Sequence, residues 1–228
     1  MCGRYSLYAS RAKLKEQFQI ARDLAPDSLF GRYNIAPSQP VATVRIAQDG
    51  VRELVPLRWG LIPHWAKEAK LEYSTINARA ETAAEKPAFR SAFRYRRCLI
   101  PANGFYEWQA RPQANLKQPW YIQRQDGEVF AFAGLWERWQ SQAEVIESCT
   151  ILVTDANELL RPIHDRMPVI LDPSDYELWL DPFQHDLQAL KSLLKPYPAW
   201  RLSARKVGLR VNNPKNDDPA CLEPAALN

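Results

Sequence analysis

CLIPANGFYEW, at residues 98–108, is the first of four segments that indicate the fold. The others are PWYIQR at 119–124, VFAFAGLWERW at 129–139 and SCTILVTDA at 148–156. Each is short, rich in aromatic and β-branched residues and bounded by turn-forming residues, which is typical of β-strands. Nearer the N-terminus, VATVRI and ELVPLRWGLI within residues 41–62 are joined by a turn at residues 48–50 and predict a hairpin. We therefore predict an α+β fold, a single compact domain over residues 2–228 with a curved, mostly antiparallel β-sheet or barrel-like core flanked by helices.

Four segments around these strands have patterns typical of helices. They are residues 10–20, with Ser10 as the expected N-cap, residues 78–86 before Pro87, residues 172–179 and residues 184–194. The arginine-rich run at residues 94–97 is expected to form a solvated basic face. The tail from about residue 212 is expected to be loop-like or frayed.

Composition excludes several classes of protein. The longest apolar runs fall far short of the roughly 18 residues that a membrane span needs, and no apolar signal segment follows Met1, so we expect a cytoplasmic protein without a membrane partner. The four cysteines show no CxxC pairing and no histidine at metal-ligand spacing, which predicts free thiols, no metal and no cofactor. The net charge of +4 permits a polyanionic partner without requiring one.

Cys2 is the candidate reactive centre. Removal of Met1 would leave a residue that carries both a thiol and a free α-amine, whose pKa of about 7.7–8.0 leaves part of it neutral at neutral pH. A neutral amine can attack an aldehyde to form an imine, and the thiol can then close a five-membered thiazolidine. Taken alone, a Met-Cys start is more often accidental than functional.

Six motifs occur in order along the chain. They are CGRY at residues 2–5, GRYNIAP at 31–37, WGLIPHW at 59–65, INARAET at 76–82, CLIPANGFYEW at 98–108 and IHDRMP at 163–168. Together they resemble the SRAP family, the SOS-response-associated peptidases that include abasic-site processing proteins. A weaker match follows in SARKVGLRVNNPKN at residues 203–216.

The resemblance implies four catalytic residues. Cys2 would bond to the ring-opened aldehyde of an abasic site, and Glu107 would act as general acid and base for imine formation. His164 would lie beside the sugar and protonate its ring oxygen, and Asn77 would hold the amine or the sugar without competing as a nucleophile.

It also implies a DNA-binding surface. Arg4, Arg79 and Arg166 correspond to phosphate contacts, and Trp65 is the expected stacking residue beside the lesion. Asn34 lies in a motif near the site, but its turn could be wholly structural.

The function implied is that of an abasic-site sensor that forms a covalent crosslink through Cys2 with abasic sites in single-stranded DNA, acting as a monomer in the DNA damage response. Such a protein would act at the bacterial nucleoid, or in the nucleus of a eukaryote. Two alternatives remain open. A thiol with His164 and Glu107 could form a cysteine peptidase, and Trp65 with the arginines could make a non-catalytic single-stranded DNA binder.

Overall fold

The central strands close into a barrel. The computed structural model describes residues 2–69, 74–110 and 116–225. The barrel strands are β4 (Pro40–Ile46), β5 (Arg52–Trp59), β7 (Arg97–Ala102), β10 (Phe130–Gln140) and β11 (Val145–Asp155). They pair antiparallel in the order β11–β10–β7–β4–β5, and β5 then pairs parallel with β11 to complete the circle. The hairpin predicted around residues 48–50 is confirmed as β4 and β5.

Short strands extend the barrel sheet. They are β2 (Arg22–Asp23) beside β5, β6 (Asn77–Arg79) and β12 (Arg166–Pro168) beside β11, and β13 (Ile170–Leu171) beside β10.

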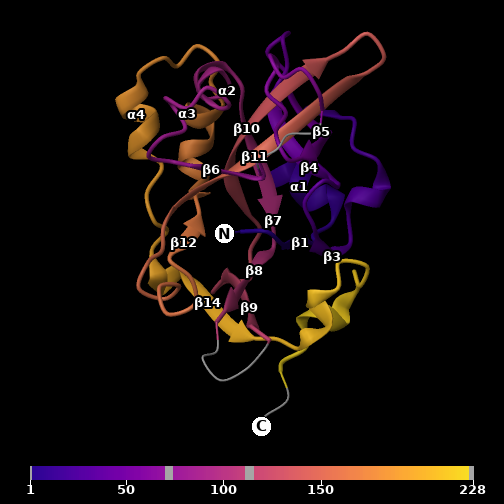
Figure 1. Ribbon diagram of the computed structural model, residues 1–228, viewed down its shortest axis with the longest axis vertical. Helices are drawn as coiled ribbons and strands as arrows, with labels where there is room; N and C mark the ends of the chain where they lie inside the picture. The colour runs from indigo at the N-terminus through magenta and orange to yellow at the C-terminus, as the bar shows by residue number, and fades with distance from the viewer. Residues whose placement is uncertain (1, 70–73, 111–115, 226–228) are drawn as a thin grey trace.

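A second sheet lies below the barrel in the view of Figure 1, and we call it the lower sheet. Its order is β14 (Leu202–Lys206), β9 (Gln118–Arg124), β8 (Gly104–Gln109), β1 (Tyr5–Leu7) and β3 (Arg32–Ile35). β7 runs into β8 through Asn103, whose side-chain oxygen accepts hydrogen bonds from the amides of Tyr8 and Ala9 at 2.8 and 2.9 Å. This corner carries the chain from the barrel to the lower sheet and ties the N-terminal segment to it. The fold class predicted above is therefore confirmed.

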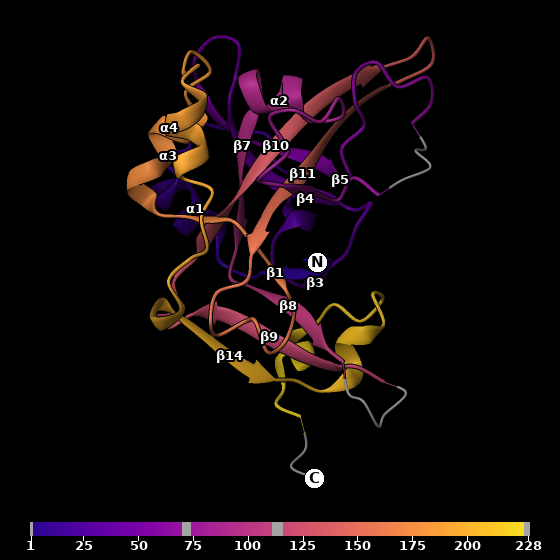
Figure 2. The ribbon, with the colours of Figure 1, turned by 60° about the vertical axis from the view of Figure 1, so that its left-hand side comes forward.

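The helices are short and lie around the barrel and at the ends of strands (Figures 1 and 2). They are α1 (Arg11–Gln17), α2 (Arg90–Tyr95), α3 (Tyr176–Leu180) and α4 (Leu187–Ser192), with 3-10 turns η1 (Asp27–Leu29), η2 (Pro173–Asp175), η3 (Ala199–Arg201), η4 (Leu209–Asn212) and η5 (Pro219–Leu222). The predictions of α1, with the Ser10 side chain capping Lys13 N at 3.2 Å, of α3 and of α4 are confirmed.

One helix prediction is wrong. The alanine-rich segment before Pro87 is not a helix, because residues 77–79 pair with β11 and bury Ala78 in the core, so that strand pairing overrides helix propensity. The tail from about residue 212 consists of turns and the short element η5, as expected of a loop-like segment, but it is packed and not frayed up to residue 225: Val211 and Cys221 are fully buried, and η5 is capped by the Asp218 side chain. Residues 226–228 lie outside the described part.

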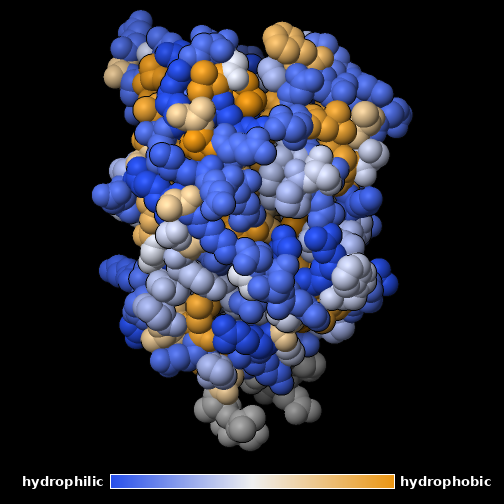
Figure 3. All heavy atoms as spheres, turned by 180° about the vertical axis from the view of Figure 1, so that it is seen from behind, coloured by the Kyte–Doolittle hydropathy of each residue, from blue (hydrophilic) through white to orange (hydrophobic). Residues whose placement is uncertain are grey.

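One hydrophobic core runs through both sheets, and a smaller cluster lies between the outer face of the lower sheet and the C-terminal segment. Mostly hydrophilic side chains cover the face seen in Figure 3. Among the described residues, no helix is long and apolar enough to cross a membrane.

Gly104 sets how closely β8 and β9 approach. A Cβ atom at this position would lie 2.4 Å from the Tyr121 ring and 2.6 Å from the Ile122 carbonyl oxygen. Only glycine fits there without a shift of the β9 backbone.

Arg97 corrects the expectation of a solvated basic face. Its side chain is buried, and its guanidinium donates to the carbonyl oxygens of Phe93 and Arg94 at the end of α2 and of Trp179 and Asp181 at the end of α3. Burial lowers its pKa to about 10. A cation at two helix C-termini satisfies carbonyls that lack partners within their helices.

We expect Arg97→Met to destabilise the protein by roughly 3 kcal/mol, because several buried carbonyls lose their donor. Urea unfolding measures this change. The matched control is the exposed Arg94→Met, expected to change stability by less than about 0.5 kcal/mol. Equal effects of the two substitutions would contradict the structural role of Arg97.

Candidate active site

The N-terminal segment enters the seam between the barrel and the lower sheet, where the N label lies in Figures 1 and 2. Tyr5 pairs with Phe105 on β8, and its ring packs edge-on against Trp59 and Phe132 of the barrel. Cys2, three residues earlier, is fully buried and belongs to the main core. The first residues are thus held by both sheets.

Glu107 places a carboxyl group beside Cys2. It stands on β8, is only 3% exposed, and its Oε1 atom lies 3.3 Å from the Trp108 amide. Burial, and then the charge of Glu107, raise the pKa of the Cys2 thiol far above its usual range. The thiol is therefore protonated at neutral pH.

Asn77 and His164 come from two segments on either side of β11. Asn77 opens β6, which pairs with β11, and its amide donates to the Ile151 carbonyl at 3.5 Å. Its buried Oδ1 atom accepts no hydrogen bond from the described residues. A buried amide oxygen without a donor can accept one from a ligand.

His164 precedes β12, and two groups approach its Nδ1 atom. The Arg166 amide lies at 3.0 Å, and an Asp165 carboxylate oxygen at 2.8 Å. The amide favours a ring with the proton on Nε2, and the carboxylate favours a proton on Nδ1. The two residues that follow His164 thus fix the position of its ring through contacts at Nδ1.

Arg4 holds the N-terminal segment as well as lining the site. Its guanidinium donates to Asn34 Oδ1 and to the Val211 carbonyl, both at 2.8 Å, and lies 5.7 Å from the centre of the Trp108 ring. Burial lowers its pKa. The amide of Asn34 in turn donates to three carbonyls of the C-terminal segment, those of Val211, Asn213 and Asn216.

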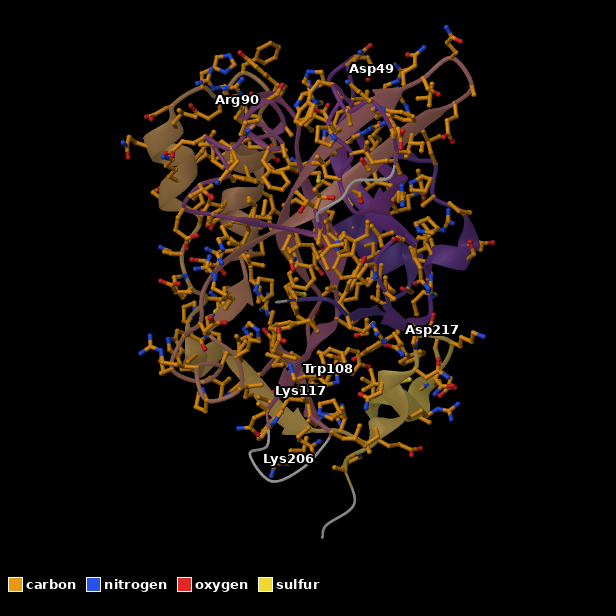
Figure 4. The ribbon with its side chains drawn as sticks, viewed as in Figure 1. Asp49, Arg90, Trp108, Lys117, Lys206 and Asp217 are labelled. Carbon is orange, nitrogen blue, oxygen red and sulfur yellow. The ribbon has the colours of Figure 1, made fainter. Side chains whose placement is uncertain are left out.

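Asp217 is a supporting residue that the sequence did not reveal. Its carboxylate accepts hydrogen bonds from the backbone amides of Tyr33 and Asn34 at 2.6 and 2.7 Å and from the Arg32 side chain. Figure 4 shows it below the barrel, toward the C-terminal part. It lies one residue beyond the weakest motif, so pattern matching had no signal for it. The GRYNIAP motif is thus the docking site of the C-terminal segment.

The remaining DNA-binding candidates differ in their exposure and in whether other protein groups already bind them. Arg166 is paired with Glu81 at 2.7 Å and with Asp155 at 2.6 Å, whereas Arg79 is exposed. Burial tends to raise the pKa of Glu81, but the hydrogen bond from Arg166 helps to outweigh this effect, and the pKa is lowered. Trp65 is 52% exposed, with its indole nitrogen 3.3 Å from the Pro87 carbonyl oxygen. Trp65 and Arg79 are exposed, while the guanidinium of Arg166 is already bound by two carboxylates.

A hollow of about 1190 Å³ lies at another end of the barrel, near the turn between β4 and β5. Among the described residues that line this hollow there is none of the four catalytic and four DNA-binding candidates. Several of its ionised groups pair with one another, as Arg22 does with Asp49 and Arg45 with Glu147. No group of three or more His, Cys, Asp or Glu residues in the described ranges could hold a metal ion.

We expect Cys2 in the folded protein to react with iodoacetamide at least tenfold more slowly than free cysteine near neutral pH, because the buried thiol is protonated. Intact-mass spectrometry with peptide mapping measures the rate, and denatured protein is the control in which all four cysteines react. The stability that this thiol contributes is fully present below an unfolded pKa of about 8.5 and is lost as pH rises from there through the raised folded-state pKa. Alkylation of native Cys2 as fast as free cysteine would contradict this geometry.

Comparison with known proteins gives a consistent result. A family model described as SOS response associated peptidase (SRAP) matches residues 1–214. The Bacillus subtilis protein named abasic site processing protein YoqW is 45% identical, over 98% of this chain and 99% of that protein. The Rattus norvegicus abasic site processing protein HMCES is 32% identical, over the whole of this chain and 77% of that protein.

Solved structures agree with the sequence matches. A crystal structure of a Bacteroides thetaiotaomicron protein superposes with a TM-score of 0.84 at 28% identity, over 99% of this chain and all of that one. Another, from Bordetella bronchiseptica, gives a TM-score of 0.79 at 32% identity over 91% of this chain. Given a family match over nearly the whole length, the chain belongs to the SOS response associated peptidase (SRAP) family.

Proposed function

We propose that this protein processes abasic sites in DNA by forming a covalent bond through Cys2, and that its substrate is single-stranded. The observation that carries this proposal is the Cys2–Glu107 pair, a buried thiol beside a buried carboxyl group at the start of the chain. Relatives over the full length of this chain carry the name abasic site processing protein.

The α-amine of Cys2 is the nucleophile in the first step. After removal of Met1, the neutral amine of Cys2 attacks the C1′ aldehyde of the opened sugar, and a C–N bond forms. Glu107 takes a proton from the nitrogen and returns one to the departing hydroxyl, so that one water leaves and an imine remains. A protonated thiol does not compete for the aldehyde at this stage.

The thiol of Cys2 is the nucleophile in the second step. The sulfur adds to the imine carbon, its proton passes to the nitrogen, and the thiazolidine ring closes. The net reaction joins one aldehyde and one N-terminal cysteine with loss of one water. No oxidant, metal or cofactor enters this balance.

Asn77 and His164 support the sugar. The Asn77 Oδ1 atom accepts a hydrogen bond from the amine or a sugar hydroxyl. His164 donates a proton to the ring oxygen and so favours the open aldehyde over the closed sugar. Arg79, Arg166 and Trp65 hold the flanking DNA by phosphate contacts and stacking.

The thiol argues against the peptidase alternative as the main activity. A cysteine peptidase attacks with a thiolate whose pKa is depressed by a neighbouring cation, whereas burial and Glu107 raise the pKa of Cys2. A non-catalytic DNA binder, the other alternative, would need neither Cys2 nor Glu107 in the seam.

The proposal predicts a covalent adduct. Incubation with single-stranded DNA that carries one abasic site, followed by denaturation and intact-mass measurement, should show protein plus DNA minus one water, attached to the first peptide. Cys2→Ala should abolish the thiazolidine, and Glu107→Gln should slow adduct formation by about 10²- to 10⁴-fold through loss of acid–base catalysis.

An N-terminal extension that keeps the Cys2 side chain is the matched control for the amine. It should abolish the adduct, because the amine becomes an amide. A full adduct yield in the extended protein, or no adduct in a protein with a free Cys2 terminus, would overturn the mechanism.

A further inference from the structure

A row of three side chains crosses the lower sheet outward from the site. Glu107 on β8 pairs with Trp120 on β9, and Trp120 pairs with Lys206 on β14. Residues directly opposite each other in antiparallel strands point to the same face, and neighbouring strands lie about 4.8 Å apart. Trp120 and Lys206 therefore stand roughly 5 and 10 Å from Glu107 across the sheet, a span comparable to one nucleotide.

Exposure rises along this row. Glu107 is buried, Trp120 is partly buried against the core, and Lys206 is exposed. Figure 4 places Lys206 below the barrel, near the lower end of the molecule. The row leads from the reactive centre to solvent, as a path for a DNA strand must.

Trp120 is held in place by a residue that also touches the His164 segment. Its indole nitrogen donates to Gln109 Oε1 at 3.1 Å, and the Gln109 amide donates to the Pro162 carbonyl at 2.9 Å. Gln109 lies two residues after Glu107 and so on the same face of β8. The ring is thus fixed relative to both catalytic segments.

Lys206 brings a positive charge that has no carboxylate partner among the described residues. Its Nζ atom lies 5.5 Å from the centre of the Trp120 ring, and no carboxylate lies within 4 Å of it in residues 2–69, 74–110 and 116–225. Arg166, by contrast, is paired with two carboxylates. An aromatic face beside an unpaired cation is the arrangement that takes a base by stacking and its phosphate by charge.

We propose that Trp120 and Lys206 form a further DNA subsite, in which Trp120 stacks on the base next to the abasic site and Lys206 pairs with a phosphate of that nucleotide. The inference rests on the proposed function, since it places the flanking strand relative to Cys2. It adds two contacts on the lower sheet to the proposed surface of Arg79, Arg166 and Trp65, of which Arg79 and Arg166 lie on β6 and β12 beside β11.

The test combines protein variants with shortened DNA. Single-turnover crosslinking is measured on abasic oligonucleotides with nucleotides on both sides, only on the 5′ side or only on the 3′ side of the lesion. For the wild type, removing the flank that occupies the subsite should slow crosslinking. Trp120→Ala should slow crosslinking of the full substrate about 5- to 100-fold. Removal of that flank should then cause no further loss of rate in this variant.

Lys206→Gln tests the charge without touching the core. It should slow crosslinking about threefold at low salt and reduce the salt dependence of binding to abasic-free single-stranded DNA by about 0.7 in the log–log slope. The matched control is Lys191→Gln on α4, far from the lower sheet in Figure 1, which should change neither quantity. Trp120→Phe keeps a stacking ring and should retain most of the rate, which separates lost stacking from lost folding.

The outcomes are distinct for the two proposals. Two results would overturn the subsite alone. In the first, the wild type crosslinks and both Trp120→Ala and Lys206→Gln crosslink at the same rate as the wild type. In the second, the rate loss in the variants adds to the rate loss caused by removing either flank of the DNA. If the wild type forms no adduct on the full substrate, the proposed function fails instead. Unchanged binding of abasic-free DNA by both variants would then overturn the subsite as well.

Discussion

Glu107 buries a carboxyl group beside the buried thiol of Cys2, and both sheets and both ends of the chain are arranged around this pair. A carboxylate loses several kcal/mol of hydration when it is taken from water, and a neighbouring thiolate would repel it. The protein resolves the conflict by keeping the thiol protonated. In the mechanism that we propose, the amine therefore acts as the first nucleophile and the carboxyl group moves protons.

Holding these two groups together requires both ends of the chain. β7 passes from the barrel into β8 at Asn103, and the Asn103 side chain binds the backbone just after β1. From the other side, Asn34 and Asp217 join β3 to the C-terminal segment, and Arg4 binds Asn34 and Val211 together. The N-terminal residues are therefore bracketed by segments about 30 and 200 positions away. Neither end of the chain forms the site alone.

The residues that we propose to contact DNA divide according to their electrostatic surroundings. Arg4 and Arg166 are already bound by protein acceptors, so part of their role is to hold the structure, and in the proposed complex a phosphate would compete with carboxylates for Arg166. Arg79, Trp65 and Lys206 are exposed. The proposed site thus combines a rigid interior with an exposed surface for the flanking strand.

Several features could be predicted from the sequence: the β-rich class, the hairpin of β4 and β5, the capped helix α1 and the family. Strand periodicity, turn residues and caps act over a few neighbouring positions and so leave local patterns. The sequence motifs also pointed to Cys2 and Glu107, which the structure brings together. Two sequence predictions failed for the same reason: residues 77–79 pair with β11 where a helix was expected, and Arg97 is buried because it binds carbonyls at the end of α3, such as that of Trp179, 82 positions further along the chain. Three features could not be predicted from the sequence: the closure of the barrel by β5 and β11, the hydrogen bonds of Asp217 to β3, and the row from Glu107 to Lys206. Each depends on register and packing between segments far apart in sequence, which no local pattern records.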